Sequence, residues 1–419
     1  MNKDVIKQII VENQERIPGL SVFRRDYNLE PEANYVFTGQ RRAGKTYLMY
    51  RMIQDMVSEG KSIEGVLYIN LEDERLIGLE TPELDLIVQS YRELFPHEPV
   101  FFFDEIQNVA GWQKFIRRLA DSNHRVYVTG SNAVMLSREI AASLGGRFLV
   151  KEVESLSFSE YLGFEGLMIG KNLAYESKRF EVARLFEDFF SFGGFPELHK
   201  FQDRKEYLRM IYQRVFIGDI IERHQVRNPM ALKLLVRKLA ESTMDKVSFN
   251  RLKNIISSVG IKVGTATLIE YLSYLKESYL LRDLQNYSNK ISERESKKKY
   301  YFRDHGLLSL FLTKPKSFQL ETLVHNTLRN RFSDSLFYLR NGYEVDFFIP
   351  GRSLIQASYS LDKEETRKRE VQALVKAAKN YPVDELMIIT RTENEIIREG
   401  GLEIKIIDVV SWLLKEFRA

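Results

Sequence analysis

Short apolar runs alternate with amphipathic stretches along the first third of the chain. Five runs have the length and composition of buried strands, at residues 35–38, 66–70, 100–104, 125–129 and 148–153. Apolar positions at helical spacing lie between them, near residues 45–58, 82–95 and 111–122, and also in residues 1–20 at the start. Such an alternation is typical of a parallel sheet covered by helices on both faces. We therefore predict an α/β core with a parallel five-stranded sheet.

The pattern changes after residue 157 and again near residues 230 and 315. The stretch from 158 to 229 is mostly helical and aromatic, and it contains the sharp turn Phe192-Gly193-Gly194-Phe195-Pro196. The aromatic residues of this turn either plug a domain interface or pack in an ordinary core. We expect four parts: a core at 1–157, a helical connector at 158–229, a winged helix-turn-helix at 230–314 and a C-terminal α/β domain at 315–419.

The third part has the element order of a winged helix. A helix opens at Ser248 and runs to Ser258, residues 260–264 form a turn, and a longer helix begins at Thr265. Strand-like residues follow on both sides of a polar loop rich in lysine. Two helices followed by a hairpin are typical of winged helix-turn-helix modules.

A phosphate-binding signature follows the first predicted strand. The chain reads Gly39-Gln40-Arg41-Arg42-Ala43-Gly44-Lys45-Thr46-Tyr47 and then becomes helical in pattern. The two glycines let the backbone curl so that its N–H groups face one anion, and the positive end of the helix dipole points to the same place. Lys45 can reach the β- and γ-phosphates, and the Thr46 hydroxyl can ligate Mg²⁺. We expect ATP rather than GTP, because the chain has no Asn-Lys-x-Asp motif to read guanine.

Two adjacent carboxylates end the third predicted strand. Four apolar residues lead directly to Asp104 and Glu105. The carboxyl ends of parallel strands are where open α/β sheets bind ligands. We expect Asp104 to hold Mg²⁺ through water, and Glu105 to act as the base that orients and deprotonates an attacking water.

Further polar residues stand where they could respond to a γ-phosphate. The fourth strand ends at Thr129, and Ser131 and Asn132 follow it; one of these three residues could act as a sensor, although they could equally form a turn and a helix cap. Arg147 precedes the last strand and could reach a γ-phosphate in its own or a neighbouring subunit, as an arginine finger does. A surface ion pair is the alternative for Arg147, as it is for Arg41, Arg42 and Arg138.

Several short motifs together resemble those of one family. The sequences GQRRAGKT, FFFDEIQ, VYVTGSN, LGGRF, FGGFP and EVDFFI resemble motifs of bacterial and archaeal AAA+-like P-loop ATPases that carry a C-terminal domain of unknown function. The resemblance covers nearly the whole chain. It implies a RecA-like or AAA+ core, a nucleotide site at Lys45, Thr46, Asp104 and Glu105, and a winged helix within residues 240–310.

The C-terminal part is similar to a restriction-nuclease-like fold. The pattern predicts a helix at 320–331, hairpin-like strands at 336–339, 344–349 and 353–358, a charged helix at 363–380, and a final strand and helix. Nuclease sites of this kind combine acids that hold Mg²⁺ with a lysine that stabilises charge on the attacked phosphate. Glu321, Asp346 and Gln356 match the pattern, but Ser358 takes the place of the lysine. We therefore expect an inactive nuclease-like domain, unless Lys363 or Lys376 reaches the acids.

Positive charge is concentrated in residues 231–316, which contain 17 Lys and Arg against 8 Asp and Glu, although the net charge of the chain is only +4. Lys290, Arg294 and the run Lys297-Lys298-Lys299 lie on the expected wing, where they could neutralise DNA phosphates. The second helix of the module, however, offers no Arg, Asn or Gln to read bases. Winged helices also dock proteins, so DNA and a protein partner remain alternatives.

The bulk composition narrows the class of protein. With 44% hydrophobic and 12% aromatic residues, the chain is globular, and the lack of cysteine excludes disulfides, thiolate zinc sites and cysteine catalysis. No two of the six histidines stand at ligand spacing, so we expect no zinc. We expect a cytoplasmic protein without membrane spans, because there is neither a signal-peptide core nor a run of 18 apolar residues.

These patterns together predict an Mg²⁺-dependent ATPase in which hydrolysis drives movement between the core and the C-terminal half. In one interpretation the nucleotide state controls association with DNA. In the other, the protein is a switch that binds a protein partner. A Mg²⁺-dependent nuclease is a third hypothesis, and oligomers are compatible with all three.

Overall fold

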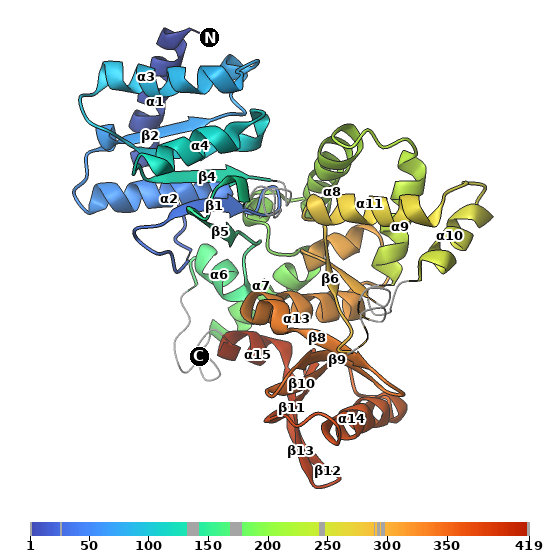
Figure 1. Ribbon diagram of the computed structural model, residues 1–419. Helices are drawn as coiled ribbons and strands as arrows, with labels where there is room; N and C mark the ends of the chain where they lie inside the picture. Colours follow the sequence, from blue (N-terminus) through green and yellow to red (C-terminus); the bar gives the residue numbers. More distant parts are fainter. Residues whose placement is uncertain are drawn as a thin grey trace. The chain divides into compact units, whose positions relative to one another are not determined.

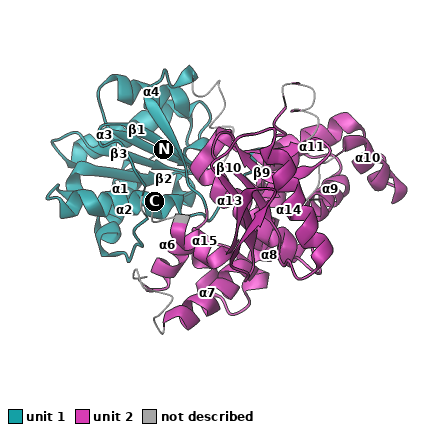
Figure 2. Cartoon of the chain, turned by 90° about the horizontal axis from the view of Figure 1, so that it is seen from below, with its two compact units in different colours: residues 1–154, 277–279 teal, residues 155–276, 280–419 magenta. Residues whose placement is uncertain are grey.

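The computed structural model describes residues 2–25, 27–131, 142–167, 178–242, 248–288, 290, 294 and 298–416. The chain forms two compact units (Figure 2). Unit 1 contains residues 1–154 together with 277–279, and unit 2 contains residues 155–276 and 280–419. None of the described helices is both long enough and apolar enough to span a lipid bilayer.

Unit 1 is built on a five-stranded parallel sheet, as predicted (Figure 1). The strand order is β2-β3-β4-β1-β5, and every neighbouring pair is parallel. The strands are β1 (Asn34–Thr38), β2 (Val66–Asn70), β3 (Val100–Asp104), β4 (Val126–Gly130) and β5 (Phe148–Glu152). Since all strands run in the same direction, the residues that follow β1, β3 and β4 meet at one edge of the sheet.

Helices cover both faces of this sheet. They are α1 (Lys3–Arg16), α2 (Lys45–Ser58), α3 (Leu84–Leu94) and α4 (Trp112–Asp121). Side chains alternate between the faces of a strand, and the phenylalanines of β3 show the consequence. Phe101 and Phe103 belong to the core that includes residues of α1, α3 and α4, whereas Phe102 belongs to the core that includes α2. The uninterrupted apolar run of β3 therefore arises because both faces of the strand are buried.

The first part of unit 2 is helical. Its helices are α6 (Phe158–Phe164), α7 (Lys178–Phe192), α8 (Arg204–Arg214), α9 (Pro229–Glu241), α10 (Phe249–Ser258) and α11 (Thr265–Glu277). A π-helix, Val215–Glu222, continues α8. The antiparallel strands β6 (Leu281–Leu284) and β7 (Lys299–Phe302) follow α11. One hydrophobic core extends through α8, α9, α10 and α11 to these two strands.

A six-stranded mixed sheet forms the rest of unit 2. The elements are α13 (Lys316–Phe332), β8 (Phe337–Arg340), β9 (Glu344–Ile349), β10 (Ser353–Ala357), α14 (Glu364–Ala378), β11 (Glu385–Thr390), β12 (Glu395–Glu399), β13 (Leu402–Asp408) and α15 (Val409–Glu416). The strand order is β12-β13-β11-β10-β9-β8. Strands β8, β9 and β10 are antiparallel neighbours, whereas β10 and β11 are parallel and joined by α14. The residues after β6 also pair with this sheet, since the Tyr287 N–H donates to the Tyr338 carbonyl at 2.8 Å.

The prediction of one final strand was wrong, because three strands follow α14. The sequence pattern did not predict the hairpin that β12 and β13 form. Four of the five residues of β12 are exposed at the sheet edge. An edge strand that buries neither face lacks the apolar alternation by which a strand is recognised in a sequence.

The Phe-Gly-Gly-Phe-Pro turn is held inside unit 2 by Asp304. The Asp304 carboxylate accepts hydrogen bonds from the N–H groups of Gly194 and Gly306, both at 2.9 Å. A Cβ at Gly193, where φ is +86°, would lie 1.8 Å from Asp304 Oδ1, and a Cβ at Gly194 would lie 2.2 Å from the Leu156 carbonyl oxygen. Both glycines are therefore required by close packing. Phe195 belongs to the hydrophobic core of unit 2 and Phe192 packs against that core, which is the second of the two alternatives for the aromatic residues.

Candidate nucleotide site

The loop between β1 and α2 has the backbone of a phosphate-binding loop. Gly39 has φ +140°, and a Cβ there would lie 2.1 Å from the Val153 carbonyl oxygen, so only glycine fits. Gly44 has φ +98° and immediately precedes α2. The Lys45 ammonium is buried and donates to the carbonyl oxygens of Gly39 and Gln40, at 3.2 Å each. The curled loop thus surrounds its own lysine at the N-terminus of α2.

Asp104, at the end of β3, accepts three side-chain hydrogen bonds. Thr46 and Tyr68 each donate a hydroxyl to Asp104 Oδ2 at 2.8 Å, and the Thr129 hydroxyl donates to Oδ1. Burial and the neighbouring charge of Glu105 raise the pKa of Asp104, while the three hydroxyls oppose the shift. The structure therefore brings Thr46 and Asp104, the two residues predicted to hold Mg²⁺, into direct contact.

Glu105 lies next to the loop lysine. Its Oε1 is 3.9 Å from Lys45 Nζ, and its Oε2 accepts a hydrogen bond from Gln107 Nε2. Its backbone has φ +51°, and its N–H donates to Thr129 Oγ1 at 2.9 Å. Burial alone would raise the pKa of Glu105, but the charges of Lys45 and Arg41 and the hydrogen bonds of Gln107 and Ser131 together outweigh burial and lower the pKa. Glu105 is thus a charged carboxylate at neutral pH, as a general base has to be.

The structure describes two of the three predicted sensor residues, Thr129 and Ser131. Thr129 is fully buried and links Asp104 to the Glu105 backbone. Ser131 is buried too, and its hydroxyl accepts from Gln107 Nε2 at 3.4 Å. Asn132 and Arg138 lie outside the described residues. The described part of the chain therefore gives Thr129 an ordering role at the carboxylates.

The remaining loop residues differ in their surroundings. Among the described residues, the Gln40 amide is 1% exposed, yet neither its nitrogen nor its oxygen has a hydrogen-bond partner. Arg41 pairs with Glu72 at 3.3 Å, Ala43 is buried, and the Tyr47 ring is 44% exposed. Arg42 has φ +66°. An unsatisfied buried amide is costly, so Gln40 fits a loop that a polar ligand completes.

Arg147 lies at the end of the sheet where the parallel strands begin, opposite the end that carries the phosphate-binding loop. It precedes β5, which is parallel to β1 with Phe148 opposite Asn34. Because a five-residue strand spans roughly 16 Å, Arg147 is remote from the loop that follows β1 in its own chain. Its guanidinium forms an ion pair with Asp121. The predicted finger therefore cannot serve the nucleotide site of the same subunit.

The sequence analysis did not assign two residues of the site, Tyr68 and Gln107. Tyr68 lies in the middle of β2, where an aromatic residue indicates only a buried strand, so its hydrogen bond to Asp104 leaves no signal in the sequence. Gln107, in contrast, is part of the FFFDEIQ motif. Its position two residues after Glu105 could have indicated a polar partner for that carboxylate.

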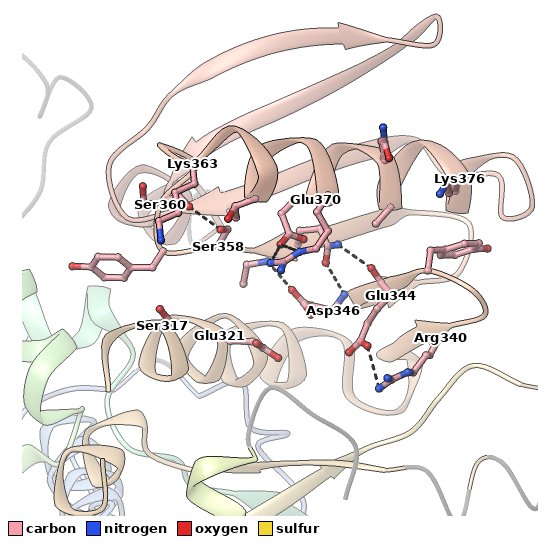
Figure 3. A pocket seen from close by; sticks show the side chains of 18 of the residues that line it. Ser317, Glu321, Arg340, Glu344, Asp346, Ser358, Ser360, Lys363, Glu370 and Lys376 are labelled. Carbon is pink, nitrogen blue, oxygen red and sulfur yellow. Dashed lines mark hydrogen bonds and ion pairs between the residues drawn. The ribbon is translucent and has the colours of Figure 1, made fainter. Parts of the chain in front are cut away.

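The structure also brings together the predicted acids of the C-terminal part, around a pocket of about 960 Å³ (Figure 3). Glu321 on α13 and Asp346 on β9 both line this pocket, as does Gln356 on β10. Gln356 Oε1 accepts from the Asp346 N–H at 2.9 Å, and Gln356 Nε2 donates to the Glu344 carbonyl at 3.0 Å. Among the described residues, neither Lys363 nor Lys376 forms an ion pair with Glu321 or Asp346, although both lysines line the pocket.

The lysine that contacts these acids is Lys299, which the sequence analysis assigned to the basic wing. Its side chain is 0% exposed, so the assignment of Lys299 to a DNA-facing surface was wrong. Lys298 pairs with Asp283 at 3.2 Å, the Arg294 guanidinium donates to the Ser288 carbonyl, Lys290 is exposed, and Lys297 lies outside the described residues. The apolar neighbours of Lys299 in sequence, Tyr300 to Phe302, were a sign that its strand is buried.

Two families are matched by separate parts of the chain. A family described as "AAA domain" matches residues 32–162, and a domain of unknown function matches residues 183–317. Over 417 residues the chain is 34% identical to uncharacterized protein MJ1544 of Methanocaldococcus jannaschii, covering 97% of this chain and 92% of that protein. The chain belongs to the same family as MJ1544. It is an AAA+-like P-loop protein whose AAA domain is followed by a domain of unknown function.

Other known proteins are similar to this chain to a lesser degree. An uncharacterized protein of Haemophilus influenzae is 26% identical over 400 residues, covering 91% of this chain and 94% of that protein. The Walker-type ATPase of Pyrococcus abyssi is 14% identical with a TM-score of 0.42, covering 74% of this chain and 95% of that chain. AMPPCP-bound DnaA from Aquifex aeolicus is 13% identical with a TM-score of 0.26, covering 64% and 86%.

Proposed function

We propose that unit 1 binds ATP and hydrolyses it. The observation that carries the proposal is the meeting of Thr46, Asp104 and Glu105 beside the Lys45 ammonium, at the edge of the sheet where the phosphate-binding loop ends. Oxygen ligands from a hydroxyl and a carboxylate suit Mg²⁺, and the unsatisfied Gln40 amide supports a ligand in the loop. The match of residues 32–162 to an AAA domain supports the same activity.

Each residue has a defined part in this proposal. The loop N–H groups and the Lys45 ammonium bind the phosphates, for which Lys45 leaves the carbonyl oxygens of Gly39 and Gln40. Glu105, held charged by its surroundings, orients the attacking water and accepts its proton. Bound Mg²⁺, held by Thr46 directly and by Asp104 through water, would neutralise the charge that develops on the transferred phosphoryl group.

ATP binding and hydrolysis are tested separately. Lys45→Ala should abolish binding of ATP, measured by calorimetry with Mg²⁺, whereas Lys114→Ala, which removes an exposed lysine of α4, should bind ATP as the parent does. Glu105→Gln should still bind ATP but hydrolyse it about 10²–10⁴-fold more slowly, the usual contribution of a positioned base. A Glu105→Gln variant that hydrolyses ATP at the parent rate would exclude the role proposed for Glu105.

We further propose that α10, α11, β6 and β7 form a winged helix that associates with DNA according to the nucleotide state. In residues 248–264, Arg251, Lys253 and Lys262 are exposed, and no Asp or Glu interrupts them. These three residues now carry the proposal, because Lys299 is buried and Lys298 is paired. They would contact phosphates rather than bases, so little sequence preference is expected.

The alternative is a switch that binds a protein partner. ATPase turnover measured with and without DNA at two salt concentrations distinguishes the two functions. A DNA-coupled ATPase should turn over faster with DNA, and the stimulation should fall as salt rises, because bound phosphates release counterions. Replacing Arg251, Lys253 and Lys262 by alanine should remove the stimulation but leave basal turnover unchanged. If DNA leaves ATPase turnover unchanged, the result would favour a switch that binds a protein partner.

We propose that the last part of unit 2 is a restriction-nuclease-like domain. The order of α13, β8, β9, β10, α14 and β11, with β10 and β11 parallel, supports this fold. Glu321 and Asp346 would then stand where such nucleases hold Mg²⁺. Whether they can do so depends on Lys299.

A further inference from the structure

The Lys299 ammonium lies among three carboxylates in unit 2. Its Nζ is 2.9 Å from Glu344 Oε1, 3.2 Å from Asp346 Oδ1 and 3.5 Å from Glu321 Oε1. The lysine comes from β7, whereas the acids come from α13 and β9. Glu321 Oε1 also accepts a hydrogen bond from the Tyr301 hydroxyl at 2.7 Å. The cluster is therefore a nearly closed network of charges that joins β7 to the C-terminal sheet.

The geometry separates Lys299 from the pocket that the acids line. Glu321, Glu344 and Asp346 all border the pocket, and Figure 3 shows Glu321 and Asp346 approaching the same space from α13 and β9. The Lys299 side chain, in contrast, is 0% exposed and is not part of the pocket wall. A phosphate group bound in the pocket would therefore meet the carboxylates but not the ammonium. Lys299 cannot stabilise charge on an attacked phosphate as a nuclease lysine does.

The same residues do not fit a divalent cation. Mg²⁺ needs about six oxygen ligands at roughly 2.1 Å. The ammonium already occupies the space between Glu321 and Asp346, and the second oxygen of Asp346 accepts the Ala357 N–H at 3.1 Å. The Gln356 oxygen is engaged by the Asp346 N–H. Within the part of the chain that the structure describes, no three His, Cys, Asp or Glu side chains are arranged to hold a metal ion.

We propose that Lys299 is a built-in cation that replaces the metal of a nuclease-like site. Its ammonium lies where a metal ion would have to lie between the acids, so the domain binds no divalent cation there and cleaves no phosphodiester bond. The network instead holds the β6–β7 hairpin against the C-terminal sheet.

Removing the ammonium should free the carboxylate oxygens that it contacts, Glu321 Oε1, Glu344 Oε1 and Asp346 Oδ1, to bind a metal ion. We would measure Mn²⁺ binding by electron paramagnetic resonance, and the melting temperature with and without Mn²⁺, on the full chain without nucleotide. Lys299→Met keeps an unbranched side chain that is one atom shorter, but it removes the ammonium from the three carboxylates, so its melting temperature should be lower and should rise on adding Mn²⁺. The double variant Lys299→Met with Asp346→Asn should lose this response. Lys298→Met, which alters the neighbouring lysine paired with Asp283, should gain no Mn²⁺ site.

The wild-type chain decides the proposal even if Lys299→Met does not fold. The expected result is that wild type and Asp346→Asn bind Mn²⁺ identically, and that neither cleaves single-stranded or duplex DNA with Mn²⁺. Mn²⁺ binding or DNA cleavage by the wild type that disappears in Asp346→Asn would overturn the proposal. So would a folded Lys299→Met variant that gains no Mn²⁺ binding.

Discussion

The Thr46 hydroxyl donates a hydrogen bond to Asp104 Oδ2 at 2.8 Å, across 58 residues of sequence. Thr46 is the second residue of α2, and Asp104 is the last residue of β3. The contact therefore joins a helix N-terminus to the carboxyl edge of the sheet. Tyr68 donates to the same oxygen at 2.8 Å from the neighbouring strand β2. Two hydroxyls thus orient one carboxylate oxygen, and the proposed Mg²⁺ site depends on that orientation.

Tyr68 is a positioning residue for Asp104, and its hydroxyl can be removed alone. Tyr68→Phe keeps the buried ring but deletes one of the hydrogen bonds that lower the pKa of Asp104. We expect the acid limb of the pH profile for ATP hydrolysis to move to higher pH, and the Mg²⁺ concentration for half-maximal rate to rise several-fold.

Tyr50→Phe is the matched control for this change. The Tyr50 hydroxyl contacts the Tyr68 hydroxyl at 3.3 Å and accepts from Arg16, and within the described part of the chain it forms no hydrogen bond with Asp104. It should shift the profile less than Tyr68→Phe does. Equal shifts in the two variants would show that the hydrogen bond from Tyr68 to Asp104 has no specific effect.

Arg147 should act on a neighbouring subunit if it acts on ATP at all. It lies at the sheet edge opposite the loop of its own chain, so Arg147→Ala should lower turnover at least tenfold only where subunits associate. An arginine finger typically contributes about 10³-fold or more. Mixing Arg147→Ala with Lys45→Ala should then restore part of the activity, since each variant supplies what the other lacks.

The control for Arg147 is a second arginine near the same acid. Arg117 lies 3.7 Å from Asp121, the residue that also pairs with Arg147. Arg117→Ala should keep parental turnover. If Arg147→Ala also keeps it at all protein concentrations, the guanidinium serves only the surface ion pair.

The Asp304 carboxylate should contribute strongly to the stability of unit 2. Asp304→Ala leaves the buried N–H groups of Gly194 and Gly306 without their acceptor. Each unsatisfied buried group costs about 1–3 kcal/mol, so we expect the free energy of unfolding to fall by roughly 2–5 kcal/mol. Urea denaturation measures the loss. Asp304→Asn, which retains one acceptor oxygen, should lose less, and equal losses in the two variants would contradict the contribution of the hydrogen bond to that oxygen.

His325 should make the protein sensitive to acid. Burial lowers the pKa of His325 to about 3, and its ring stacks on Tyr301 with centroids 4.0 Å apart. Between an unfolded pKa of about 6.5 and the folded value, only the unfolded chain takes up the proton, so stability falls as the pH falls through this window. The slope from this residue is at most about 1.4 kcal/mol per pH unit.

His325→Phe removes this proton but keeps an aromatic ring beside Tyr301. The difference in unfolding free energy between wild type and His325→Phe should therefore change steadily from pH 6.5 downwards, in the direction that favours the variant. Denaturation at a series of pH values measures it. A difference that stays constant with pH would show that His325 is not buried in its neutral form.

Much of the nucleotide site could be predicted because its parts are local in sequence. Gly39 to Thr46 form a single strand-loop-helix unit, and Asp104 with Glu105 closes an apolar run, so each half is recognisable without knowing what packs against it. The parallel sheet followed from the alternation of strands and helices. Once the strands are parallel, the two halves have to meet at the same edge.

Only the tertiary structure decided which distant residues share a site. Lys299 looked like part of a basic surface run, yet it is buried with acids 22 and 47 residues away. Arg147 looked close to the phosphates, but the register of β5 against β1 places it at the other edge. Tyr68 reaches Asp104 only because β2 and β3 are neighbours. Local propensity and motif spacing are encoded within a few residues, whereas burial and charge pairing depend on strand order and register, which no short stretch of sequence contains.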